Sequence, residues 1–164
     1  GGRAVHGSTL LLVLMQRAVH SAAAGTWPAD AAAETAALDY EDRARRRIRL
    51  RCESGFVFLL DLPAVVRLRD GDGLKLDDGR WIGVRAAPEP LIEVSCANPE
   101  DLARLAWHVG NRHISAEVRA GTIRFRYDPV IVDMVKGLGA RPVALEAPFQ
   151  PEPGAYAHKG HSHG

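Results

Sequence analysis

Two proline-containing helix starts, 30 residues apart, are the feature that most constrains the fold of this chain. Asn98-Pro99-Glu100-Asp101 places a capping side chain before a proline at the first helical position, with acidic residues at the positive end of the helix dipole. Asp128-Pro129 repeats the cap and the proline. Strand-like segments lie before, between and after the two helices, at residues 91–96, 115–118, 123–127 and 143–146. This βαββαβ order predicts a ferredoxin-like domain over residues 89–149, with both helices on one face of an antiparallel sheet.

Residues 43–88 have a different pattern, which predicts strands with no helix between them. Ile48 and Leu50 alternate with arginines, so one face of this strand would be buried and the other wet. Asp70-Gly71-Asp72-Gly73 and Asp77-Asp78-Gly79 are typical of turns, because glycine adopts a positive φ without steric cost. We therefore predict an α+β protein whose first domain, residues 1–88, is small and all-β.

The N-terminal part of this first domain and its C-terminal boundary have weaker sequence patterns. The apolar run at residues 10–15 predicts a short buried strand, with a signal peptide as the alternative interpretation. Residues 27–42 are rich in alanine and acids, and we expect a loop or a short helix there. Pro88 and Pro90 predict a linker between the domains, because proline restricts the backbone of the residue before it.

The charge balance and the scarcity of cysteine exclude several classes of protein. The chain has 21 Lys and Arg against 20 Asp and Glu, a net charge of +1, which does not suit a protein that binds nucleic-acid phosphates. Cys52 and Cys96 cannot form a disulfide scaffold or a zinc site of four thiolates. We therefore expect a reduced, cytoplasmic protein. The acidic turn at residues 70–73 lacks the later ligands of a calcium loop.

Three of the seven histidines, His158, His161 and His163, lie in the last seven residues. Prolines precede them, so we expect residues 150–164 to form a flexible tail. Neutral imidazole binds nickel, copper and zinc, and in an extended chain His161 and His163 project to the same side. His158 can reach the same ion if the chain turns between them. The tail therefore predicts a metal-binding segment, with a merely solvated chain end as the alternative.

Two more histidines frame the end of the first predicted helix. His108 lies in its last turn, where a protonated imidazole suits the helix dipole and can cap carbonyl groups. His113 follows the turn sequence Gly110-Asn111-Arg112, in a loop position that is available to ligands. A single imidazole cannot hold a metal, so His113 needs the tail or a second copy of the chain across a twofold axis. Arg112 either holds this loop or pairs with a carboxylate.

Three motifs in this order resemble the UreE family, the nickel chaperones among the urease accessory proteins. The resemblance covers roughly residues 40–164 and implies a non-enzymatic protein with a peptide-binding-like first domain and a dimerising second domain. Nickel, Ni(2+), would be cargo rather than a catalytic cofactor, and zinc or copper could replace it in vitro. The motifs are Asp70-Gly71-Asp72 before a β-hairpin, Gly110-Asn111-Arg112-His113 after a helix, and Pro148-Phe149-x-Pro151-Glu152-x-Gly154-Ala155-Tyr156 before the His-containing end.

The resemblance also implies site residues and partners. His113 from each subunit of a homodimer would meet its twin and bind nickel, and His158, His161 and His163 would supply further ligands. The nickel would pass to the urease-maturation GTPase, UreG, in a complex with the urease apoprotein. The stretch Arg126-Tyr127-Asp128-Pro129 has no histidine where some relatives carry a pair, so we do not expect that extra site.

Two functions of other classes compete with this interpretation. One is a peptide- or protein-binding adaptor whose N-terminal strands offer an edge for strand addition, with incidental metal binding. The other is a hydrolase that uses Cys52 or Cys96 with His108 or His113. No nucleophile elbow or known Cys/His signature surrounds either cysteine, so we predict that the protein is not an enzyme.

Overall fold

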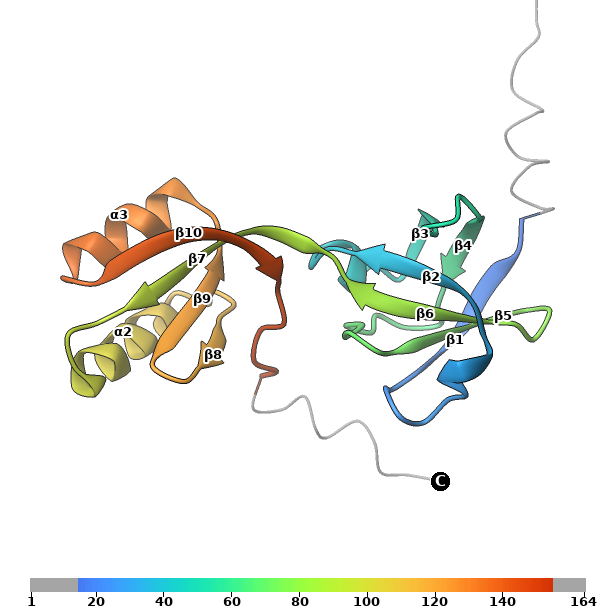
Figure 1. The fold of residues 1–164 in the computed structure, drawn as a ribbon, viewed down its shortest axis with the longest axis horizontal. Helices are drawn as coiled ribbons and strands as arrows, with labels where there is room; N and C mark the ends of the chain where they lie inside the picture. The colour runs from blue at the N-terminus through green and yellow to red at the C-terminus, as the bar shows by residue number, and fades with distance from the viewer. Residues whose placement is uncertain (1–14, 155–164) are drawn as a thin grey trace, which may run out of the picture. The chain divides into compact units, whose positions relative to one another are not determined.

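The computed structural model describes residues 15–154 of the chain (Figure 1). The described residues divide into two compact units, with the boundary between Ala87 and Pro88. The first is built from strands and the second from strands and two α-helices, which confirms the predicted α+β class. The predicted strand at residues 10–15, apart from Met15, lies outside the described residues. Within the described part of the chain, no helix is long and apolar enough to cross a membrane.

The first unit contains a six-stranded sheet in the order β2-β6-β5-β1-β4-β3. The β1–β4 and β2–β6 pairs are parallel, and the other neighbours are antiparallel. Two single-turn 3-10 helices, η1 (Ala29–Ala31) and η2 (Asp42–Ala44), lie between the early strands. The strands are β1 (Arg17–Ala22), β2 (Ala32–Leu38), β3 (Arg47–Arg51), β4 (Val57–Asp61), β5 (Gly73–Leu76) and β6 (Trp81–Ala86).

The predicted alternation around Ile48 builds one wall of the first core. Leu50 is 5% exposed and Ile48 packs against the same core, whereas the arginines of β3 face solvent. In β4, Phe58 and Leu60 are fully buried. Since side chains of a strand alternate between its two faces, β3 contributes its apolar residues inward and its charges outward.

Strand β2 corrects the prediction of a loop or a short helix in residues 27–42. Ala36 is fully buried and Leu38 is 3% exposed, so alternate residues of this alanine-rich segment enter the core. Pairing with β6 runs from Ala32 to Leu38, with an irregularity between Ala32 and Glu34, and gives the backbone of β2 hydrogen-bond partners on one side. Alanine favours helix, but its small side chain fits the core here and β6 offers a strand to pair with. Tertiary packing therefore overrides the local propensity.

Glycines shape the turns of the first sheet as predicted. Gly71 and Gly79 have φ values of 86° and 90°, the left-handed region that glycine adopts without strain. Gly73 has another reason to lack a side chain, because a Cβ there would lie 2.4 Å from the indole ring of Trp27. Gly71 and Gly79 therefore permit the turns, and Gly73 leaves room for Trp27 beside β5.

The second unit contains a four-stranded antiparallel sheet in the order β10-β7-β9-β8. Side chains from both α-helices share one buried core with Val94, Ile123 and Phe125 of the sheet, so both helices cover the same face (Figure 1). This arrangement confirms the predicted ferredoxin-like order. The elements are β7 (Pro88–Ser95), α2 (Pro99–Asn111), β8 (Glu117–Arg119), β9 (Thr122–Arg126), α3 (Pro129–Gly137) and β10 (Arg141–Pro148).

Both helices begin at the predicted caps. The Asn98 side chain accepts a hydrogen bond from the Asp101 amide at 2.8 Å, and the Asp128 side chain accepts one from the Val130 amide at 2.8 Å. Each bond satisfies an amide that has no partner within its helix. The caps and the following prolines therefore set where each helix starts.

Pro88 and Pro90, which we predicted to form a linker, lie instead within β7. They pair with β10, where Pro88 lies opposite Pro148 and Pro90 opposite Glu146. Strand β9 pairs with β7 only from Leu91 onward. A strand tolerates residues without an N–H where that side carries no ladder, and both prolines precede the stretch of β7 that pairs with β9, although the Pro90 carbonyl accepts a hydrogen bond from the Tyr127 amide at 3.0 Å.

Candidate metal centre

His113 follows α2 in a left-handed turn. Its φ of 56° is the only positive φ at a non-glycine residue among the described residues. The His113 amide donates to the Gly110 carbonyl at 3.1 Å, and the Ile114 amide donates to the Val109 carbonyl at 3.3 Å. The left-handed conformation costs an ordinary residue roughly 1–2 kcal/mol. The helix end and Ile114, which packs against the second core, hold the turn against this cost.

The residues around His113 form an exposed surface at the end of α2. Asn111, Arg112 and His113 are exposed, and Trp107 is 65% exposed. The half-buried His108 meets the Trp107 ring edge-on, with ring centroids 5.1 Å apart. No salt bridge within residues 15–154 includes Arg112. The imidazole of His113 is therefore accessible to a second molecule or to another part of the chain.

His113 has no other metal ligands close enough in the described residues to complete a site. In residues 15–154, no group of three or more His, Cys, Asp and Glu side chains is arranged to hold a metal ion. The other predicted ligands, His158, His161 and His163, lie outside the described residues. A tight site at His113 therefore needs ligands from the C-terminal segment or from a second copy.

The start of the predicted tail is attached to the strand that follows His113. The Glu152 amide donates to the Ala116 carbonyl at 2.8 Å, and the Gln150 amide donates to the Glu117 carboxylate at 2.9 Å. Phe149 is fully buried and Pro151 is buried. The motif at residues 148–156 did not predict this anchoring role, although an aromatic residue directly after a proline could have suggested it.

This attachment limits how far the terminal histidines can lie from His113. Ala116 lies three positions after His113, a span of at most roughly 11 Å. His158 lies six positions after Glu152, which allows at most roughly 21 Å. Chain length therefore permits His158 to reach the exposed end of α2 from a fixed starting point.

The two cysteines lie in surroundings that disfavour a nucleophilic thiolate. Cys52 is 3% exposed, and burial, with the charges of Glu34 and Glu53, raises the pKa of its thiol to about 11. Burial also raises the pKa of the Cys96 thiol, and the negative charge of Asp101 raises it further. A reactive cysteine needs a lowered pKa and access to its substrate. Neither cysteine has the environment that the hydrolase interpretation requires.

We expect Cys52 to react with a thiol reagent at neutral pH far more slowly than Cys96, because it is less accessible and its thiolate is rare. Labelling of the native protein with iodoacetamide, followed by mass spectrometry of the peptides, measures both rates. A Cys96→Ser variant leaves Cys52 as the single cysteine, so its rate is measured alone. Labelling the same variant in urea gives the rate of Cys52 when it is accessible. Rapid native labelling of Cys52 would contradict its burial.

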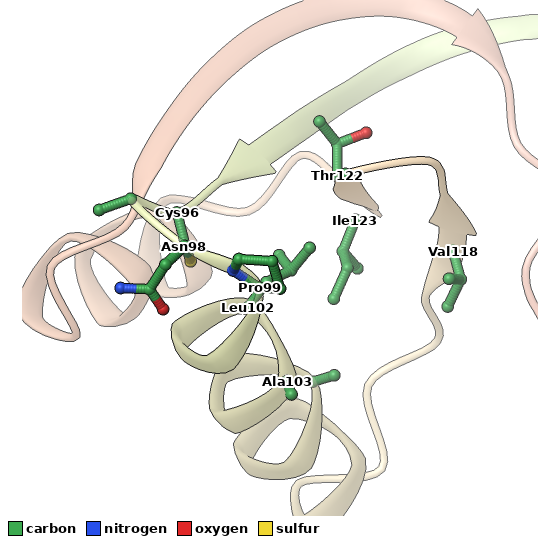
Figure 2. A pocket seen from close by; sticks show the side chains of 11 residues that line it. Cys96, Asn98, Pro99, Leu102, Ala103, Val118, Thr122 and Ile123 are labelled. Carbon is green, nitrogen blue, oxygen red and sulfur yellow. The ribbon is translucent and has the colours of Figure 1, made fainter.

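A cavity of about 540 Å³ lies between α2 and the β8–β9 hairpin (Figure 2). Its lining is mostly apolar and contains no histidine or carboxylate, and a single cysteine, Cys96, is no ligand set for a metal. The cavity belongs to the helix–sheet interface rather than to the exposed surface around His113. Its labelled lining residues are Cys96, Asn98, Pro99, Leu102, Ala103, Val118, Thr122 and Ile123.

Comparison with known proteins identifies the family. Residues 15–87 match the family model described as UreE urease accessory protein, N-terminal domain, and residues 89–164 match the one described as UreE urease accessory protein, C-terminal domain. The chain belongs to the UreE family. The two matches cover both structural units and confirm the resemblance drawn from the motifs.

Several UreE proteins, each named urease accessory protein UreE, resemble this chain closely. The protein of Bradyrhizobium sp. (strain ORS 278) is 53% identical over 135 residues, 82% of this chain and 64% of that protein. The protein of Beijerinckia indica subsp. indica is 51% identical over 139 residues, 85% of this chain and 80% of its own length. The Rhodobacter capsulatus protein is 47% identical over 154 residues, 92% of this chain and 95% of that protein. The chain thus spans less than two thirds of the first of these UreE relatives.

Proposed function

We propose that this UreE family chain is a cytoplasmic nickel metallochaperone, without enzymatic activity of its own, that delivers nickel for assembly of the urease active site. A homodimer would hold Ni(2+) between the two copies of His113, and His158, His161 and His163 would add ligands. The nickel would then pass to UreG and the urease apoprotein. The observation that carries this proposal is an exposed histidine, held in a left-handed turn, with no other ligands assembled around it in the described residues.

An exposed, incomplete site suits a carrier. Imidazole is a good nickel ligand, and a ligand set shared between subunits can open when the partners move. Trp107, 65% exposed and six residues before His113, gives this surface an apolar component that a second copy could cover. The attachment of Glu152 to Ala116 supports a supply of further ligands from the C-terminal segment.

Nickel titration calorimetry, combined with sedimentation velocity, tests this proposal on the full chain. We expect one tight nickel event for two chains and a dimer that carries the ion. Nickel affinity should fall on acidification, because protons compete with the metal for imidazole. Activation of urease apoprotein with purified UreG should proceed further with the loaded chain than with the same amount of free nickel. Equal activation by free nickel would overturn the delivery role.

A further inference from the structure

Five arginines lie within residues 45–51, around β3 in the first unit, with no acidic residue among them. The full chain carries a net charge of only +1, so this surplus is local. No salt bridge within residues 15–154 includes any arginine of this group. We call the group the β3 arginines, and all five are exposed: Arg45, Arg46, Arg47, Arg49 and Arg51.

Strand β3 is also the last strand in the order of its sheet, and only β4 pairs with it among the described residues. Beyond its last residue, the Glu53 amide donates to the Thr35 carbonyl of β2 at 2.9 Å. The stretch from Arg47 to Arg51 has no such second partner in residues 15–154. This stretch is therefore an edge that can accept another strand.

Hydrogen bonds show which residues present their backbone to that edge. The Leu62 amide donates to the Arg46 carbonyl at 2.9 Å, and the Cys52 amide donates to the Phe56 carbonyl at 2.7 Å. In an antiparallel pair, alternate residues direct their N–H and C=O groups toward the partner, so the even-numbered residues of β3 bond to β4. Arg47, Arg49 and Arg51 therefore direct their backbone groups away from β4.

The same three residues place their side chains on the solvent face. Leu50 is 5% exposed and turns into the core, so the arginines on either side of it project from the opposite face. Successive arginines in this row lie roughly 7 Å apart, the repeat of alternate residues in a strand. Each open backbone position of the edge thus carries a guanidinium group.

The neighbouring strand leaves most of this charge unneutralised. Arg49 and Arg51 lie opposite Leu59 and Val57 of β4, which carry no charge. Arg47 lies opposite Asp61, whose carboxylate forms a salt bridge with Arg17 and is also attracted by Arg46 and Arg47. A like-charged row also discourages pairing between two copies of β3, since two rows of arginine repel each other. Charge therefore favours a strand of opposite sign at this edge.

We propose that the open edge of β3 binds an extended acidic segment of a partner protein by strand addition. Backbone hydrogen bonds would form with Arg47, Arg49 and Arg51, and carboxylates on alternate residues of the segment would pair with their guanidinium groups. Arg45 and Arg46 would extend the attraction beyond the strand. This inference concerns the first unit and is independent of nickel binding at His113.

The test uses the full chain and a fluorescein-labelled peptide in which glutamate alternates with valine. We expect binding that raises fluorescence anisotropy and weakens as salt is added. Hydrogen exchange should slow at the amides of Arg47, Arg49 and Arg51 when the peptide is bound. Arg49→Glu should weaken binding about tenfold or more, because it places a like charge opposite the peptide. Arg141→Glu is the matched control, an exposed arginine of β10 that should leave the affinity unchanged.

Two altered peptides separate strand addition from simple attraction between charges. A peptide with lysine in place of glutamate should not bind, and one N-methylated on alternate backbone nitrogens, which keeps the charge, should lose most of its affinity. Equal binding of the N-methylated peptide, or an unchanged affinity in Arg49→Glu, would overturn the proposal. Binding of phosphatidylserine vesicles or single-stranded RNA without binding of the acidic peptide would likewise replace it with a general polyanion surface.

Discussion

Replacing His113 by asparagine is expected to abolish the tight nickel event and leave the fold intact. Asparagine tolerates the left-handed backbone that His113 adopts at φ 56°, so the turn should survive the change. The proposed site loses both copies of its central ligand at once. Since loss of an outer-shell partner alone costs 10–100-fold in metal affinity, we expect a loss of more than about 100-fold. Calorimetric titration with nickel measures it.

His20→Asn is the matched control for this experiment, because His20 is an exposed histidine of β1 in the first unit. Its titration should equal that of the unaltered chain. A variant that ends at Gly154 removes the terminal histidines and should lower the number of bound ions or the affinity, without removing the tight event. If His113→Asn bound nickel as tightly as the unaltered chain, the proposed site between two copies of His113 would have to be abandoned.

Phe149→Ala is expected to reduce the free energy of unfolding by roughly 3–5 kcal/mol, the cost of emptying a buried aromatic position. Phe149 is fully buried and directly precedes the residues that bond to Ala116 and Glu117. Urea denaturation, followed by circular dichroism, measures the change. Loss of the anchor should also reduce the contribution of the terminal histidines to nickel binding.

Two further variants separate burial from a general effect of removing aromatic residues. Phe149→Leu keeps most of the apolar volume and should cost markedly less than Phe149→Ala. Tyr127→Ala removes an aromatic side chain that is 52% exposed and should change stability by no more than about 0.5 kcal/mol. A cost below about 1 kcal/mol for Phe149→Ala would show that this segment is not anchored through its aromatic residue.

Local chemistry explains which parts of the fold were predictable. The caps at Asn98 and Asp128 act through amides two or three residues away, and the turn at Gly79 depends on its own φ. Such features can be predicted from the sequence because the interacting residues lie only a few positions apart. Strand β2 was not predicted, because its pairing with β6 involves residues some 50 positions away and its alanines carry no strand preference.

The candidate site shows the same division. The sequence alone identified His113 as the histidine of a loop after a helix, and it identified the terminal histidines by their number and spacing. The tertiary structure decided that His113 is exposed in a left-handed turn, and that Glu152 attaches beside it to Ala116, 36 residues earlier. Residue type determines which side chains can bind a metal. Only the packing of the sheet and helices decides which of those side chains lie within reach of one another.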